Sequence, residues 1–261
     1  MPASYPGRAF LSPAAILRAV PAWTCTPRRL PHRLGSVHHK RRCILPNKMA
    51  KPRTGDTSKP ALSMPANATL PGLAKASKNC QACDLWKRGT QTVFGEGSPG
   101  ASLMLIGEQP GDQEDLQGHP FVGPAGKLLD TALERAGIAR EQTYVTNAVK
   151  HFKWEPRGKR RIHKKPNTAE IAACRPWLEA EIAAVQPKII VCLGATAAQS
   201  LLGRAFRVTQ QRGLLLKSKL APFIMATVHP SSILRAPDEE TRHAEMQRFI
   251  EDLKKAANRL S

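Results

Sequence analysis

Two histidines, His151 and His163, lie in a stretch of the chain, residues 148–165, that is crowded with lysine and arginine. Imidazole can transfer protons, ligate a metal or, in its neutral form, act as a nucleophile. A basic run is also typical of a solvated surface loop, which gives both histidines an ordinary structural explanation. The side chains that the fold brings to these rings therefore decide their role.

Four further polar residues stand where they could take part in chemistry. Glu108 lies at the end of one apolar run and Asp112 follows it, Asn147 lies in a second run, and His229 ends another. Carboxylates transfer protons, an amide offers both donors and an acceptor, and a neutral imidazole donates an N–H. Each of these residues alone is also common in turns, so their meaning depends on whether the fold brings them together.

The elements that must position these residues alternate along the chain. Apolar runs that predict buried strands occupy residues 102–109, 143–149, 188–194 and 223–230. Helical patterns occupy residues 125–137, 167–185, 195–203 and 241–260, and the second of these opens with the capping pair Asn167 and Glu170. This alternation predicts a parallel sheet covered by helices on both faces, with ligands bound beyond the carboxyl ends of the strands.

The charge balance indicates a polyanionic partner, with nucleic acid before membrane. The 261 residues carry a formal net charge of +20 and a pI near 10.3. Residues 1–66 are rich in Pro, Arg and Ala, and we expect them to be disordered. They have the composition of an organellar transit peptide, or the natural start is Met49 and residues 1–48 are an upstream extension. No run of 18 apolar residues occurs, so we expect no transmembrane helix.

Five motifs, in this order, resemble those of the uracil-DNA glycosylase superfamily, in particular its iron–sulfur-containing family 4 branch. They read GEQPGDQED, GHPFVGPAGKLLD, YVTNAVKH, LGATAA and HPSSILR, and the resemblance runs from about Cys80 to the C-terminus. It implies an α/β fold for residues 67–261, a three-layer α/β/α domain with a central, mainly parallel four-stranded sheet.

The resemblance also implies roles at the site. Asn147 would read the Watson–Crick edge of a flipped uracil, Phe121 would stack on its ring, and Gln109 would belong to the same uracil site. His229 would donate to uracil O2 as negative charge develops on the leaving base. Phe121 has the alternative of a core aromatic, and His229 that of a hydrogen-bonded turn residue.

Further residues are assigned to DNA phosphate under the same resemblance. Ser231 and Arg235 follow His229, and Lys159, Arg160 and Arg161 lie in the basic stretch. Arginine and lysine contact phosphate, and such contacts position a protein on DNA without reading its sequence. Arg235 has the alternative of a structural ion pair.

The cysteines favour metal or redox use over a disulfide framework, which is typical of short secreted chains. The resemblance to family 4 implies a cluster site made of four cysteines. Cys80, Cys83 and Cys174 match three of these positions, whereas His151 stands where the remaining cysteine is expected. Imidazole can replace thiolate on iron, so we expect a [4Fe–4S] cluster held by these four residues. The alternative is a three-cysteine cluster, or none, with an exposed His151. Cys192 lies within a predicted strand and is interpreted as core.

The longer basic stretch ending in KRRIH resembles the UdgX branch, which excises uracil and remains attached to the abasic sugar through the loop histidine, by position His163. Only neutral imidazole can attack C1′, and neighbouring cations disfavour imidazolium. We expect that effect from Lys159, Arg160, Arg161, Lys164 and Lys165. Glu108 is then the acid/base partner, and Asp112 positions water or caps the next helix.

These observations predict a DNA repair enzyme that excises uracil from single-stranded or duplex DNA and forms a stable bond between His163 and C1′. Two alternatives stay open: a conventional glycosylase that releases a free abasic site, and a non-catalytic DNA-binding module. We expect a monomer without membrane association. Its expected place is the cytoplasm or nucleoid, or an organelle if residues 1–48 are a transit peptide.

Overall fold

The computed structural model describes residues 69–260, which belong to the second of two units of the chain, residues 54–261. The extension expected at residues 1–66 lies outside the described residues. Within the described part, no helix is both long and apolar enough to cross a membrane.

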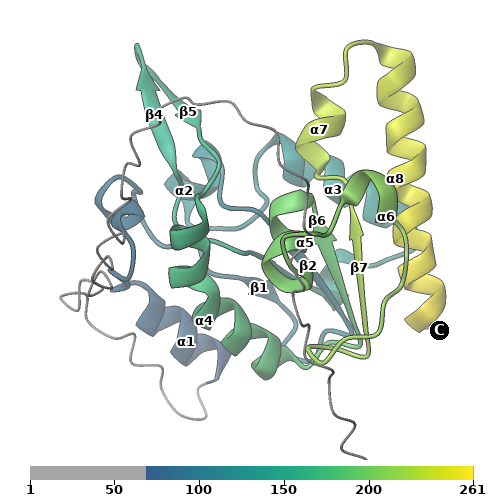
Figure 1. Cartoon of the computed structure of the whole chain (residues 1–261), viewed down its shortest axis with the longest axis horizontal. Helices are drawn as coiled ribbons and strands as arrows, with labels where there is room; N and C mark the ends of the chain where they lie inside the picture. The colour runs from purple at the N-terminus through teal and green to yellow at the C-terminus, as the bar shows by residue number, and fades with distance from the viewer. Residues whose placement is uncertain (1–68, 261) are drawn as a thin grey trace, which may run out of the picture. The chain divides into compact units, whose positions relative to one another are not determined.

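The centre of the fold is a mixed five-stranded sheet of order β1-β3-β2-β6-β7 (Figure 1). The four parallel strands are β2 (Leu103–Gly107), β3 (Thr143–Asn147), β6 (Ile189–Leu193) and β7 (Phe223–Thr227). They confirm the four predicted strands. The fifth, β1 (Glu96–Gly97), pairs antiparallel with β3 and is too short to leave a pattern in the sequence.

Helices cover both faces of this sheet, which confirms the predicted three-layer arrangement. One face packs against α4 (Thr168–Val185), α5 (Ala195–Leu202) and α6 (Val208–Gln211). The other packs against α3 (Pro124–Arg135), α7 (Pro230–Leu234) and α8 (Glu239–Leu260). Burial on both sides explains why the strands read as continuous apolar runs instead of alternating patterns. Cys192 is fully buried in β6, as predicted for a core residue.

The second predicted helix begins as its sequence indicates. Asn167 Oδ1 accepts from the backbone N–H of Glu170 at 2.9 Å, and Glu170 Oε2 accepts from the N–H of Asn167 at 2.7 Å. This reciprocal capping box satisfies two N–H groups that a helix start leaves without partners. It fixes the start of α4 immediately after the basic stretch.

Short elements complete the domain. They are α1 (Leu70–Ser77), the 3₁₀ helix η1 (Asp84–Lys87), α2 (Asp112–Gln117) and the 3₁₀ helix η2 (Arg140–Gln142). A third cluster of packed side chains joins α1 and η1 to α4 and includes Cys83, Cys174 and Trp177. This cluster attaches the N-terminal part of the described chain to the sheet.

The basic stretch is a β-hairpin and not an irregular loop. Strand β4 (Trp154–Arg157) pairs antiparallel with β5 (Arg160–His163), and Figure 1 shows the hairpin projecting beyond the sheet. Gly158 adopts φ +59° in the two-residue turn, a conformation that glycine reaches at little cost. Because side chains alternate along a strand, Arg161 and His163 share one face of β5 and Arg160 and Ile162 the other.

Candidate active site

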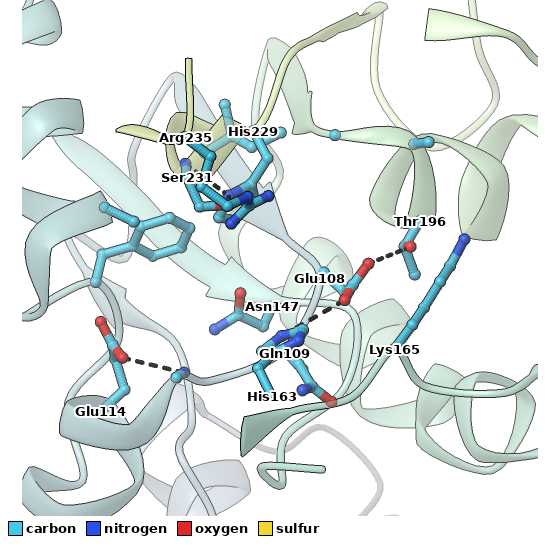
Figure 2. A pocket seen from close by; sticks show the side chains of 16 residues that line it. Glu108, Gln109, Glu114, Asn147, His163, Lys165, Thr196, His229, Ser231 and Arg235 are labelled. Carbon is cyan, nitrogen blue, oxygen red and sulfur yellow. Dashed lines mark hydrogen bonds and ion pairs between the residues drawn. The ribbon is translucent and has the colours of Figure 1, made fainter. Parts of the chain in front are cut away.

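A cavity of about 540 Å³ opens at the carboxyl ends of the parallel strands (Figure 2). Its lining includes Glu108 after β2, Asn147 at the end of β3, Thr196 after β6 and His229 after β7. The expectation that polar residues converge at this edge is therefore confirmed for Glu108, Asn147 and His229. The hairpin contributes His163 to the same cavity.

Phe121 and Asn147 approach each other closely across Gly107. A Cβ at Gly107 would lie 2.3 Å from Asn147 Oδ1 and 2.7 Å from Phe121 Cζ, so a side chain at this position would displace one or both of these groups. Phe121 has φ +59°, an unfavourable backbone conformation for an aromatic residue, and strain of this kind is concentrated at functional sites. Phe121 both packs in the core and lines the cavity, so its two sequence interpretations are compatible.

The ring of His229 is held in one tautomer. Its Nδ1 accepts the backbone N–H of Ser231 at 3.1 Å and lies 2.8 Å from the Ser231 hydroxyl. A neutral ring with Nδ1 as acceptor carries its proton on Nε2. Burial, followed by the charges of Arg235 and His163, lowers the pKa of His229 to about 4. His229 is therefore a neutral Nε2–H donor, stacked on Phe121 with 6.1 Å between ring centroids.

His163, Glu108 and Thr196 form a connected row in the cavity wall (Figure 2). His163 Nε2 lies 3.6 Å from Glu108 Oε1, within ion-pair range but longer than a hydrogen bond. The Thr196 hydroxyl donates to Oε2 of the same carboxylate. Thr196 thereby directs the other carboxylate oxygen toward the imidazole. No sequence pattern indicates this role, because LGATAA is typical of an ordinary strand-to-helix turn.

The pKa of His163 is lowered, but not chiefly by the residues expected. Burial is the largest cause, Glu108 opposes it by raising the pKa, and Arg235 lowers it further. Arg235 comes from the loop after α7, whereas the sequence predicts that the repulsion comes from lysines and arginines of the basic stretch. The lowered pKa agrees with the prediction that the His163 ring is biased toward its neutral form, but the cause is burial and Arg235.

Gln109 lines the cavity, but its side chain is engaged by the hairpin. Its Nε2 donates to the carbonyl oxygens of Lys153 and Lys164, both at 3.1 Å, and its Oε1 accepts the N–H of Lys153 at 3.2 Å. Both amide protons are thus used, and the side chain bridges the two chain segments at the base of the hairpin. Only the backbone of Gln109 is therefore available to contact a bound uracil. The predicted contact between Gln109 and uracil stays a prediction.

The side chain of Arg161 connects the hairpin to helix α2. Its Nε donates to Asp112 Oδ1 and its Nη1 to the fully buried Asp115, both at 2.6 Å. The guanidinium also lies over the rings of Phe152 and Trp154. These contacts disagree with the expectation that Arg161 binds phosphate, because its donors already have protein partners.

Asp112 is placed differently from its expected catalytic role. It lies outside the residues that line the cavity, and its carboxylate pairs with Arg161. The carboxylate of this segment that does reach the cavity is Glu114, which accepts the N–H of Gly111 at 3.0 Å and of Gly123 at 2.8 Å. Sequence reasoning missed Glu114, although its place three residues after Gly111 is the spacing of a capping box.

The other residues expected at phosphate lie on two surfaces. Lys159 and Arg160 are exposed at the tip of the hairpin, and Arg235 is exposed at the rim of the cavity. Ser231 also lines the cavity, but its N–H is used by His229. Lys159, Arg160 and Arg235 therefore keep positions that suit phosphate, whereas Ser231 acts at least in part by fixing the His229 tautomer.

The three cysteines expected at the cluster gather at one place. Cys80, Cys83 and Cys174 belong to the same packed side-chain cluster, and the proximity of Cys83 and Cys80 contributes to a raised pKa of Cys174. Trp177 Nε1 donates to the Cys80 sulfur and the Lys150 N–H donates to the Cys174 sulfur, each at 3.2 Å. Burial raises the pKa of Cys174 to about 12, so a cation would be needed to stabilise the thiolate.

His151 is buried, as a ligand would be, and its ring has a defined partner. The Thr92 hydroxyl donates to the carbonyl of Ser77 at 2.9 Å and lies 3.0 Å from His151 Nε2. Because the hydroxyl proton is used on Ser77, Nε2 is the donor and Nδ1 keeps the lone pair. A metal-ligating histidine typically donates its other N–H in this way. Among residues 69–260, however, no three His, Cys, Asp or Glu side chains are arranged as a preformed metal site.

Comparison with known proteins identifies the relatives of this domain. The sequence profile described as the uracil DNA glycosylase superfamily matches residues 94–254. A type-4 uracil-DNA glycosylase of Thermotoga maritima is 38% identical over 180 residues, which cover 69% of this chain and 88% of the relative.

Two archaeal proteins with the same description are similar. The protein of Pyrobaculum aerophilum is 36% identical over 175 residues, 64% of this chain and 86% of the relative. That of Sulfurisphaera tokodaii is 40% identical over 168 residues, 61% of this chain and 73% of the relative. The fold, the residues at the strand ends and these matches agree, and the chain belongs to the uracil-DNA glycosylase superfamily, where it is similar to the type-4 branch.

Proposed function

We propose that this protein is a uracil-DNA glycosylase that stays covalently attached to its product through His163. Membership of the superfamily and similarity to proteins named type-4 uracil-DNA glycosylases support uracil excision. The observation that carries the covalent step is the position of His163, 3.6 Å from Glu108 in the wall of the cavity that also holds Asn147 and His229.

Uracil recognition falls to Asn147 and Phe121. An uncharged amide offers an acceptor for uracil N3–H and a donor for O4, and it mismatches cytosine, which has an amino group in place of O4. The Phe121 ring would cover the face of the flipped base. Both side chains are buried, so they are held in place before DNA binds.

Cleavage of the glycosidic bond uses His229 as a neutral donor. As the bond between C1′ and N1 breaks, its electron pair leaves with the base and negative charge develops on uracil O2. The Nε2–H of His229 donates to that oxygen, and the hydrogen bond strengthens as the charge grows. The Glu108 carboxylate stabilises the positive charge that develops on the sugar. The departing base then takes a proton from water.

The sugar cation is next trapped by the imidazole of His163. The lone pair of one ring nitrogen forms the bond to C1′, and the proton on the other nitrogen passes to Glu108, so that a neutral alkylated imidazole remains. Such a nitrogen is a poor leaving group, and the bond persists. The lowered pKa of His163 supports this step, because it raises the fraction of ring that carries a free lone pair.

A denaturing gel tests the proposal against its two alternatives. The protein is mixed with a single-stranded uracil-containing oligonucleotide and, separately, with the same oligonucleotide carrying thymine. A heat-resistant shifted band with the uracil strand alone supports trapping by the protein. Release of uracil with no such band would indicate a turnover glycosylase, and absence of both would indicate a binding module.

The variant His163→Ser assigns the attached residue. It keeps the side chain polar and is expected to abolish the band while uracil release continues. A band that persists in His163→Ser would refute the assignment of the nucleophile. Lys165→Ser is the matched control, because Lys165 lines the same cavity and is also exposed, yet has no imidazole. It should keep the band.

We further propose that Cys80, Cys83, Cys174 and His151 Nδ1 hold a [4Fe–4S] cluster, which would cross-link three chain segments and neutralise buried thiolates. The N–H donors directed at the Cys80 and Cys174 sulfurs support this ligand set. His151→Ala should lower the iron and sulfide content of purified protein, and His151→Cys should restore it. His119→Ala, at an exposed histidine paired with Glu96, should leave it unchanged. Full iron content in His151→Ala would remove His151 from the ligands.

A further inference from the structure

A buried ion pair lies behind the end of the strand that carries Asn147. Lys150 and Glu181 have side chains that are 1% and 0% exposed. Neither lines the cavity, so neither can contact a bound base. Any effect of this pair on uracil must therefore pass through another residue.

The ammonium group of Lys150 uses all three of its protons. It donates to Thr146 Oγ1 at 2.6 Å, to the backbone carbonyl of Asn147 at 2.7 Å, and to Glu181 Oε2. Because each of its three protons has an acceptor, the ammonium group has one favourable position. The carbonyl of Asn147 is held beside it by one of these hydrogen bonds.

Glu181 is equally saturated, which fixes the other end of the pair. Its Oε1 accepts the N–H of Gly95 at 2.9 Å and the hydroxyl of Tyr144 at 3.0 Å. Both carboxylate oxygens also lie 3.0 Å from the Thr146 hydroxyl. The carboxylate raises the pKa of Tyr144 further above the value that burial alone would give. The pair is thus joined to β3 through Tyr144 and Thr146 and directly to the residue that reads uracil.

Helix α4 contacts Lys150 at two points. The carboxylate of Glu181 receives the side chain, and seven residues earlier the Cys174 sulfur accepts the Lys150 backbone N–H at 3.2 Å. Seven residues are about two helical turns, so both groups lie on the same side of α4. The segment from Asn147 to Lys150 is therefore held against one helix by one side-chain contact and one backbone contact.

Stability alone gives no reason to bury these charges. Replacing a buried ion pair by apolar residues of similar volume is often neutral or stabilising, because desolvation costs about as much as the attraction gains. What an apolar pair could not do is bind the Asn147 carbonyl and so fix the peptide from which the amide side chain projects. We propose that Lys150 and Glu181 are positioning residues, which hold Asn147 in the orientation that distinguishes uracil from other bases.

The test uses two substitutions together, because Lys150→Met alone would leave a buried carboxylate without its cation and could unfold the protein. The variant Lys150→Met/Glu181→Gln removes both charges and keeps acceptors for Gly95 and Tyr144. Holoprotein is bound to an oligonucleotide with one 2′-fluoro-2′-deoxyuridine, which resists cleavage, and to the same strand with thymidine. The ratio of the two dissociation constants measures uracil discrimination separately from general DNA affinity.

The ratio is expected to fall about tenfold, the effect of losing one hydrogen bond to a charged group, with iron content unchanged. In an Asn147→Ala background the paired substitutions should cause no further fall, because the residue that they position is gone. Leu253→Ala is the control for lost stability, since Leu253 is buried against the other face of the sheet. It should lower the melting temperature and leave the ratio unchanged.

An unchanged ratio in the paired variant, or an equal fall in the Asn147→Ala background, would overturn the inference. The inference rests on the proposed reading of uracil by Asn147, and the two can fail separately. If the parent protein binds both oligonucleotides equally, the proposed recognition fails. If the parent discriminates and the paired variant does so equally well, only the positioning role fails.

Discussion

Arg161→Met should separate trapping of the sugar from excision of the base. The substitution removes the cation that joins the hairpin to α2 and leaves the backbone of β5 intact. Arg161 holds Asp112 and Asp115 at 2.6 Å each. Without these contacts, the hairpin keeps the Gln109 amide as its hydrogen-bonded connection to the end of β2. His163, at the end of β5, should then spend less time beside Glu108.

The size of the effect follows from the burial of the two carboxylates. Asp112 is half exposed, and an exposed pair contributes about 0.5 kcal/mol. Asp115 is fully buried and would keep the Thr90 N–H, at 2.9 Å, as its hydrogen bond. Leaving a buried charge unpaired costs about 3–5 kcal/mol. Arg161 itself is 19% exposed, so water moderates the loss, and we take the low end, about 3 kcal/mol.

The assay follows both products of one reaction. A denaturing gel measures the rate of adduct formation, and chromatography measures free uracil. Arg161→Met should slow adduct formation at least tenfold while uracil release stays within about threefold of the parent. Arg161→Met/Asp115→Asn, which removes the unpaired charge, should recover thermal stability but not the adduct rate.

Lys159→Met is the matched control, because it removes one positive charge from the exposed tip of the same hairpin. It should weaken DNA binding and reduce its salt dependence, with the adduct rate at saturating DNA unchanged. If Arg161→Met instead behaves like Lys159→Met in every assay, Arg161 is a phosphate ligand after all and the anchoring role is wrong.

Three further predictions concern the cavity wall. Because the pKa of His163 lies below its ordinary value of 6.5, adduct formation should persist as pH falls through 6.5 and decline only below it; a decline centred at 6.5 or above would contradict the lowered pKa. The pKa of His229 is lowered to about 4 in the folded protein, whereas in the unfolded chain it is about 6.5. Between these two pH values the unfolded chain therefore binds a proton that the folded protein does not. Folding stability should therefore fall between pH 6.5 and 4, and His229→Gln should reduce that dependence in denaturant titrations; an identical pH dependence would argue against a buried neutral ring. Gly107→Ala should fold but lose uracil binding by more than tenfold, since its Cβ would lie 2.3 Å from Asn147 Oδ1, and a parental binding constant would refute the close approach.

The strands and long helices could be predicted because their signals are local. β2, β6 and β7 read as buried runs, and the Asn167–Glu170 pair marks the start of α4 before any tertiary contact is known. The order of the strands in the sheet was not predicted, because it depends on pairing between segments that are distant in the chain. Asn147 and His229 were found for the same reason, since the strand ends of such a sheet meet at one edge.

The hairpin was not predicted, because its strands carry a charge pattern that hides the alternation. Trp154 and Ile162 are the apolar members of a segment otherwise rich in Lys and Arg, and both are partly or fully exposed. With no buried face, periodicity gives little information about the structure. The contacts of Arg161 with Asp112 and Asp115 were missed for a related reason: sequence shows the charge of a side chain but not the face of the strand to which it belongs.

Thr196 and Glu114 illustrate a second limit. Each acts through a hydrogen bond to a residue elsewhere in the sequence: Thr196 donates to Glu108, 88 positions away, and Glu114 accepts the N–H of Gly123, nine positions away. Such contacts depend on where two loops meet, and a threonine after a strand or a glutamate in a short helix is ordinary. The cause of the lowered pKa of His163 was missed in the same way, because Arg235 is 72 positions away in the chain.

The two halves of the proposed reaction are supported by different parts of the molecule. Asn147 belongs to the central sheet, where its backbone is held by the buried ammonium of Lys150. His163 belongs to a hairpin attached by side chains, among them Gln109 and Arg161. Substitutions beneath the sheet should therefore reduce recognition and trapping together, whereas substitutions at the hairpin anchors should affect trapping alone. A protein with a displaced hairpin would still open the cavity to water, and water would then complete the reaction as in a turnover glycosylase. The proposed covalent outcome should thus depend on how firmly the hairpin is docked as well as on the identity of residue 163.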